Sequence, residues 1–269
     1  MFELFEYRFL DQALLAAALV ALVAAPMGWL MVTRREAFAG HTLSMMAFPA
    51  AAAGALVGVP AAIGYAVFCG GGALMLSAGE GTERDDGVGT ALVQALALAC
   101  GLLFVALYGG ELGDLESLLF GNLLAVSAAQ LAALGVCAFI VLASLATIGR
   151  RVLFASVDPV GASARGMSPR ATGRLYLLLL AATVAATSTV TGPLLVFALL
   201  VAPPAAAQAL SAHPYRSLAL SVAFGLAVAI GGVAVSFYTP YPAAFFIAAF
   251  AFLLYVAALV VAAARRRSR

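Results

Sequence analysis

Residues 10–32, LDQALLAAALVALVAAPMGWLMV, form an apolar run with a single carboxylate near its start. About 20 predominantly apolar residues are enough for an α-helix to cross the hydrocarbon core of a bilayer. The run is too long for the apolar part of a secretory signal, and it lacks the basic segment that opens one. It therefore predicts a transmembrane helix rather than a detachable signal.

The composition of the whole chain points the same way. Hydrophobic residues make up 65% of it and charged residues only 10%, and the mean hydropathy is +1.09. These values lie far from those of soluble globular domains. The basic residues are all arginine, which excludes a Walker A lysine for ATP and a lysine Schiff base. Cys69, Cys100 and Cys137 lie in apolar runs without paired spacing and are expected to be packing residues.

Apolar runs recur along the chain and predict an all-α, polytopic transmembrane bundle that forms a single domain over residues 1–269. The break at Ser188–Pro193 could also lie within one long span, which would leave eight spans instead of nine. The nine predicted spans are 10–32, 40–58, 60–78, 88–108, 128–148, 173–190, 192–210, 216–236 and 243–263.

The arginines indicate how the bundle is oriented. Cytoplasmic loops of membrane proteins carry an excess of basic residues. Nine spans with the N terminus outside place every arginine except Arg8 on the cytoplasmic side, together with the C terminus. The opposite face is then acidic and would raise the local concentration of cations, although a merely solvated rim is the alternative. Its acidic residues are Glu3, Glu6, Asp11, Glu111, Asp114 and Glu116.

The loop between the fifth and sixth predicted spans carries the signals of a short helix. Asp158 occupies the position of an N-cap, Pro159 the first helical position, and Gly166 the position where a helix commonly ends. The pattern predicts a small capped helix outside the bilayer. Its apolar and small residues suit docking into a groove on another protein, and a plain linker helix is the alternative.

The predicted span at 192–210 contains residues that disrupt helices near both of its ends, including Pro193 and Pro203. Non-helical backbone at membrane depth must be covered by protein or line a water-filled cavity. We therefore expect Pro193 and Pro203 to line a path through the bundle, with kinked helix packing as the alternative. Gln94, in the fourth predicted span, could line the same path or form an interhelical hydrogen bond.

The start of the second predicted span, FAGHTLSMMA, brings an imidazole and two thioethers into an apolar segment. His41 and Met45 are spaced i, i+4 and share one helix face, with Ser44 and Met46 beside it. Neutral imidazole suits zinc and other late divalent ions, whereas thioethers prefer softer ions. We predict that His41, Met45 and Met46 contact a passing metal ion and that Ser44 lines its path. A structural hydrogen bond of His41 is the alternative.

Four segments in the same order resemble motifs of one family, the membrane permeases of zinc, manganese and iron(II) ABC importers (ABC-3, or ZnuB-like, permeases). The heptapeptide GHTLSMM at 40–46 is similar to a subfamily of zinc permeases. The four segments are Arg34-Arg35 with Phe38–Met45, Leu119–Val126, Asp158–Gly166 and Gly192–Pro203.

The resemblance implies a type II ABC importer permease fold and a role for several residues. The family's Asp and His in the second span, thought to contact the metal, correspond to His41 and Met45, and the loss of the carboxylate favours zinc. The family's Asp in the second motif corresponds to Asn122. The coupling helix that pushes on the ATPase corresponds to residues 158–166, in which we assign coupling to Asp158, Pro159, Arg165 and Gly166.

The expected function is therefore that of a transport subunit, not an enzyme, in the bacterial inner membrane. It would work as a homodimer and import zinc as cargo, without a permanent cofactor and without nucleic acid. Separate ABC ATPase subunits and an extracytoplasmic metal-binding protein would be its partners. The alternatives are import of manganese or iron(II), or a stand-alone channel or secondary transporter. An intramembrane metalloenzyme and a structural scaffold are the remaining classes.

Overall fold

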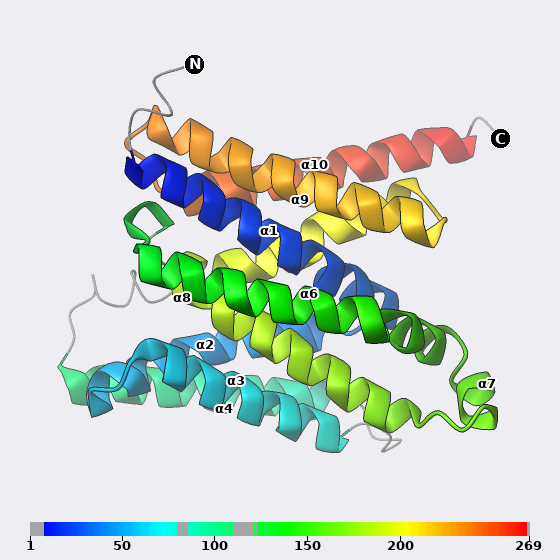
Figure 1. Ribbon diagram of the computed structural model, residues 1–269, viewed down its shortest axis with the longest axis horizontal. Helices are drawn as coiled ribbons and strands as arrows, with labels where there is room; N and C mark the ends of the chain where they lie inside the picture. Colours follow the sequence, from blue (N-terminus) through cyan, green and yellow to red (C-terminus); the bar gives the residue numbers. More distant parts are fainter. Residues whose placement is uncertain (1–7, 80–85, 110–120, 122, 268–269) are drawn as a thin grey trace.

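The computed structural model describes residues 8–79, 86–109, 121 and 123–267, and within these ranges every regular element is a helix (Figure 1). The predicted all-α bundle is thus confirmed. The elements are α1 (Arg8–Arg34), α2 (Ala37–Val57), α3 (Ala61–Gly79), α4 (Asp86–Tyr108), the 3-10 turn η2 (Leu123–Ala125), α6 (Ala128–Val157), α7 (Pro159–Ala164), α8 (Pro169–Leu210), α9 (Pro214–Phe237) and α10 (Ala243–Arg267).

Eight of the described helices are long and apolar enough to cross a membrane, and α8 is by far the longest of them. The two spans predicted at 173–190 and 192–210 both lie within it. A straight helix of this length would extend ~63 Å, about twice the thickness of a bilayer core. The α8 segment is instead two helices joined at Gly192, whose backbone is non-helical (φ 72°, ψ 160°).

The two halves of α8 run in opposite directions, as their contacts with α1 show. The hydroxyl of Tyr176, near the start of α8, donates to the Met27 carbonyl at 3.3 Å. The amide of Gln208, near the end of α8, donates to the Trp29 carbonyl at 2.9 Å. Both ends of α8 therefore meet the same turns of α1, and Figure 1 shows the chain reversing between them. The described chain thus traverses the bundle nine times, because one of its eight long helices crosses twice.

The centre of the bundle consists of α1, α2 and α8. In the most apolar stretch of α1 and of α2, 72% of the residues are buried within the chain, and in α8 the share is 61%. The corresponding share is only 17% in α4, α6 and α10, whose large apolar side chains face outward. An apolar outer surface of this kind suits contact with lipid or with another membrane helix.

The helix that contains the predicted fifth span is longer than the span itself. The span was expected at 128–148, and α6 begins at Ala128 and continues to Val157, with Arg150 and Arg151 exposed along its final turns. Hydropathy marks only the part of a helix that is apolar, whereas backbone hydrogen bonding carries the helix on through the charged segment. The Ser127 capping box fixes its start, because the Ser127 hydroxyl accepts from the Gln130 amide.

The N-terminal end of α1 and the C-terminal end of α10 lie at opposite ends of the bundle, and α7 lies at the end where α10 finishes (Figure 1). An odd number of crossings, such as nine, requires the two ends of the chain to lie at opposite ends of the bundle. Which end faces the cytoplasm stays a prediction, as does the single domain.

Of the predicted acidic rim, only Asp11 lies within the described residues, and the other five acidic residues lie outside them. Asn122 lies outside them as well.

Candidate functional site

The first turns of α2 are packed tightly against α1. Glu36 immediately precedes α2, and its carbonyl accepts a hydrogen bond from the Gly40 amide at 3.0 Å. Gly40 is buried against the sulfur of Met31 in α1, where any side chain would overlap it. The absence of a side chain at Gly40 thus sets how closely α1 and α2 approach, and it fixes the position of the residue that follows, His41.

His41 faces the second half of α8. Its ring lies against Phe197, with the two ring centroids 4.6 Å apart and the planes inclined by 58°. The side chain is half-buried, and its Nδ1 atom is buried without a hydrogen-bond partner among the described residues. Buried polar atoms are normally paired, so an orphaned imidazole nitrogen suggests a ligand or a water molecule. The structural hydrogen bond considered as an alternative for this nitrogen is not seen.

Met45 lies one turn further along the same face of α2 and is buried. Met46 points elsewhere, because its sulfur lies against Gly72 of α3 and it belongs to the hydrophobic core. The structure therefore groups His41 with Met45, while Met46 acts as a packing residue in this conformation. Within the described ranges, no three His, Cys, Asp or Glu side chains gather into a group that could hold a metal.

The other polar residues predicted for the path form hydrogen bonds within the protein. The Thr42 hydroxyl donates to Oε1 of Gln94 at 3.1 Å, so Gln94 makes an interhelical bond from α4 to α2. The Ser44 hydroxyl is fully buried and donates to the Gly40 carbonyl at 3.0 Å, within its own helix. These two bonds stabilise α2 around His41. Gln94 and Ser44 therefore each have a hydrogen-bond partner, unlike the Nδ1 atom of His41.

The reversal of α8 rests on two glycines. Gly192 and Gly121 both have positive φ values, 72° and 65°, which residues with a side chain rarely adopt. The backbone of Gly121 lies directly against that of Thr191 and Gly192, leaving no room for a side chain. Pro193 is buried beside the reversal, and Pro203 is buried about three turns further along the same half of α8. The predicted break is thus a sharp turn at the bundle end that orients Phe197 toward His41.

The short helix predicted between the fifth and sixth spans is confirmed as α7. The Asp158 carboxylate accepts a hydrogen bond from the Gly161 amide at 2.8 Å, and Pro159 takes the first helical position. The chain leaves the helix through Arg165 and through Gly166, which has a φ of 75°. Most of α7 is exposed at one end of the bundle, with Val160 81% accessible. This geometry makes α7 a projecting surface that another protein can contact.

Two features of this site were not predicted from the sequence. Phe197 is one of many aromatic residues in apolar runs, and only the reversal of α8 brings it to His41. The sequence indicates Arg34 as a cytoplasmic arginine and as part of a motif, but not that its guanidinium pairs with Glu36. An acid two residues after an arginine at the end of an apolar run is the signal that could have indicated this pair.

Comparison with known proteins identifies the family. A model of the ABC 3 transport family matches residues 6–262, nearly the whole chain. The chain belongs to the ABC 3 transport family. The resemblance inferred from the four sequence motifs is thereby confirmed.

Relatives in this family carry names from different metal systems. The chain is 33% identical over 236 residues to the manganese transport system membrane protein MntC of Halalkalibacterium halodurans, covering 86% of this chain and 80% of that protein. It is 28% identical over 235 residues to the high-affinity zinc uptake system membrane protein ZnuB of Haemophilus influenzae, covering 86% and 88%. Its fold is similar to that of a chain in PsaBC from Streptococcus pneumoniae in complex with Fab (TM-score 0.84, 24% identity, 95% and 92% covered).

Proposed function

We propose that this chain is the membrane-spanning permease of an ABC importer that takes up a divalent transition metal, with zinc as its main cargo. Membership of the ABC 3 transport family supports the importer class. The observation that supports the metal path is the orphaned Nδ1 of His41, beside Phe197 and on the same face of α2 as Met45. In this proposal α2 and the second half of α8 form the wall of the path.

The ligand chemistry supports zinc over manganese or iron(II). A neutral imidazole nitrogen is a good zinc ligand, and a thioether is a soft one, whereas the harder ions favour carboxylates. His41 and Met45 supply no carboxylate to the path. Few and neutral ligands would hold the ion weakly, as rapid passage requires. Manganese is the second candidate, because MntC of H. halodurans is named for it.

The partners in the proposal follow from the shape of the chain and from its family. The exposed α7 helix would receive an ABC ATPase subunit on the cytoplasmic side. Two copies of the chain would form a homodimer, and a separate binding protein would deliver the ion to the opposite face. ATP hydrolysis would belong to the ATPase subunits alone. A stand-alone channel or secondary transporter, the alternative class, would make no use of α7.

The proposal is tested by zinc uptake and zinc-stimulated ATP hydrolysis of the reconstituted complex. We expect His41→Ala and Met45→Ala each to slow uptake by about tenfold, as for the loss of about 1.4 kcal/mol of ligand interaction. The double variant should be slower still. His213→Ala and Met75→Ala change an exposed histidine and an exposed methionine, and they should leave uptake unchanged. Wild-type uptake in all three path variants would contradict the proposed metal path.

A further inference from the structure

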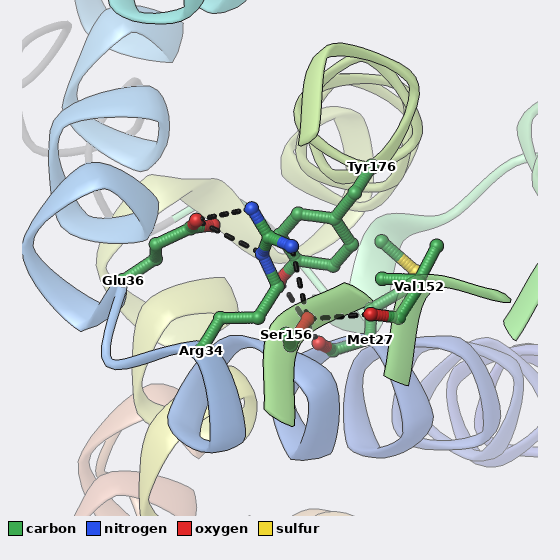
Figure 2. Close-up of polar contacts among 6 residues, drawn as sticks. All are labelled: Met27, Arg34, Glu36, Val152, Ser156 and Tyr176. Atoms are coloured by element: carbon green, nitrogen blue, oxygen red, sulfur yellow. Dashed lines mark hydrogen bonds and ion pairs between the residues drawn. The ribbon is translucent and has the colours of Figure 1, made fainter. Parts of the chain in front are cut away.

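Arg34, the last residue of α1, lies beside Glu36 at the start of α2, Ser156 at the end of α6 and Tyr176 near the start of α8 (Figure 2). Its Nη2 atom is 2.6 Å from Oε1 of Glu36, and its Nε donates to the same oxygen at 2.9 Å. Its Nη1 donates to the Ser156 hydroxyl at 3.0 Å. Its Cζ atom lies 4.9 Å from the centroid of the Tyr176 ring. The side chain is only 11% exposed, so water screens these contacts weakly.

The contacts of Arg34 with Glu36 and with Ser156 lead to two different elements of the bundle. Glu36 leads directly into α2, and its carbonyl holds the amide of Gly40, the neighbour of His41. Ser156 lies in the last turn of α6, two residues before Asp158, the cap of α7. The Arg34 guanidinium therefore connects the start of α2, which carries His41, to the end of α6, which leads into α7.

The α7 helix is itself held firmly to the end of α6. The guanidinium of Arg165 lies over the ring of Phe154, with its Cζ 4.8 Å from the ring centroid. The amide of Asp158 donates to the Phe154 carbonyl at 2.9 Å. Both flanks of α7 are thus attached to the turn of α6 that contains Ser156. A displacement of α7 would move Ser156 with it.

Tyr176 and Glu36, the other two groups of the cluster, differ in how completely their polar atoms are paired. Tyr176, fully buried and bonded to the Met27 carbonyl, forms a rigid platform under the guanidinium. The second carboxylate oxygen of Glu36 is buried and has no hydrogen-bond partner within the described part of the chain. Glu36 is therefore held through one oxygen only and retains the capacity for a different partner. A contact of this kind suits a joint between two discrete arrangements.

We propose that Arg34 is the positioning residue that transmits movement of α7 to α2, and so connects ATP hydrolysis to opening of the metal path. This inference rests on the proposed function. The connection runs from α7 through the last turn of α6 to Arg34, and from there through Glu36 to the first turn of α2. The planar, permanently charged guanidinium can hold a carboxylate and a hydroxyl at once in fixed directions, which a lysine could not.

The test measures ions transported and ATP hydrolysed in the same proteoliposomes, with the permease, the ATPase subunits and the binding protein present. We expect Arg34→Gln to keep its ATPase subunits on purification but to raise the ATP consumed per ion at least about fivefold, the lower end of typical coupling between sites. Ser156→Ala removes one contact of Arg34 and should raise the ratio less. Arg35→Gln removes the adjacent exposed charge and should leave the ratio unchanged.

An ATP-to-ion ratio that stays at the wild-type value in both Arg34→Gln and Ser156→Ala would overturn the role of Arg34. This holds whether uptake and hydrolysis both stay at their wild-type rates or fall in parallel. A parallel fall is what a purely structural role would produce. Ser156→Ala leaves the Arg34–Glu36 ion pair in place, so it tests the connection even if Arg34→Gln fails to fold. A wild-type complex that transports no metal would instead overturn the proposed function itself.

Discussion

His41 is chemically distinct from the other polar residues of α2. Thr42 and Ser44, which follow it in the same helix, both donate their hydroxyl protons to hydrogen bonds within the bundle. The Nδ1 of His41 has no such partner in the described structure and lies beside an aromatic ring. A nitrogen that is shielded from water and unpaired is ready to bind an ion that has lost part of its hydration shell. The preference of the path for one metal ion over another should therefore change when the side chain at position 41 is changed.

The first prediction at the residue scale concerns this selectivity. Replacing His41 by Asp and Met45 by His creates the carboxylate and imidazole pair of the metal permeases that the sequence resembles. Because hard ions favour carboxylates, we expect the ratio of manganese to zinc uptake to rise by about tenfold, equal to about 1.4 kcal/mol. Competition between the two ions in the reconstituted complex measures it. An unchanged ratio, with uptake retained, would argue against contact between these residues and the ion.

At the scale of elements, the decisive feature is the reversal of α8. Sequence patterns marked the disruption at Gly192 and Pro193 but allowed either one long span or two. The contacts of Tyr176 and Gln208 with the same part of α1 show two antiparallel halves. The left-handed backbone at Gly192 and the tight approach of Gly121 make that reversal possible. The orientation of Phe197 toward His41 depends on it.

Gly192→Ala should therefore destabilise the protein by about 1–3 kcal/mol, the cost of holding a side chain in a sparsely populated backbone region. The measurement is the midpoint of unfolding in detergent. Gly135→Ala is the matched control, because Gly135 lies within α6 with open space around the added methyl group, and this change should stabilise the helix by up to about 1 kcal/mol. Equal midpoints for Gly192→Ala and the wild type would show that the reversal does not require glycine.

At the scale of the whole molecule, nine crossings determine which loops share a side of the membrane. The turn between α8 and α9, at His213, should lie on the same side as Ser163 in α7. The turn between α9 and α10, at Thr239, should lie on the opposite side. If α8 crossed only once, His213 and Ser163 would be on opposite sides. The excess of arginines on one side predicts that α7 and the C terminus lie in the cytoplasm.

This topology can be measured with single cysteines at Ser163, His213 and Thr239, in a chain whose three native cysteines are replaced. We expect a membrane-impermeant thiol reagent added outside the cell to label position 239 and to leave 163 and 213 unlabelled until the membrane is opened. Labelling of 213 but not 163 from outside would contradict the reversal of α8. Labelling of 163 from outside would contradict the proposed orientation.

The helices of the bundle and their ends were easier to predict from the sequence than the contacts between helices. The helices, the cap of α7 at Asp158 and the break at Gly192 follow from local patterns, because propensity, capping and hydropathy act over a few residues. The pairing of His41 with Phe197 and that of Arg34 with Ser156 join residues far apart in the chain, and no local pattern encodes them. Met46 was grouped with His41 by proximity in sequence, although its sulfur packs toward α3.

We infer that this chain carries zinc across a membrane only in partnership with an ATPase. The most direct measurement compares initial zinc uptake into proteoliposomes by the complete complex with uptake by the permease alone, with manganese and iron(II) as competing ions. We predict uptake that requires both the ATPase subunits and ATP and that is faster for zinc than for the other two. Equal zinc uptake by the permease alone and without ATP would contradict its function as the permease of an ABC importer.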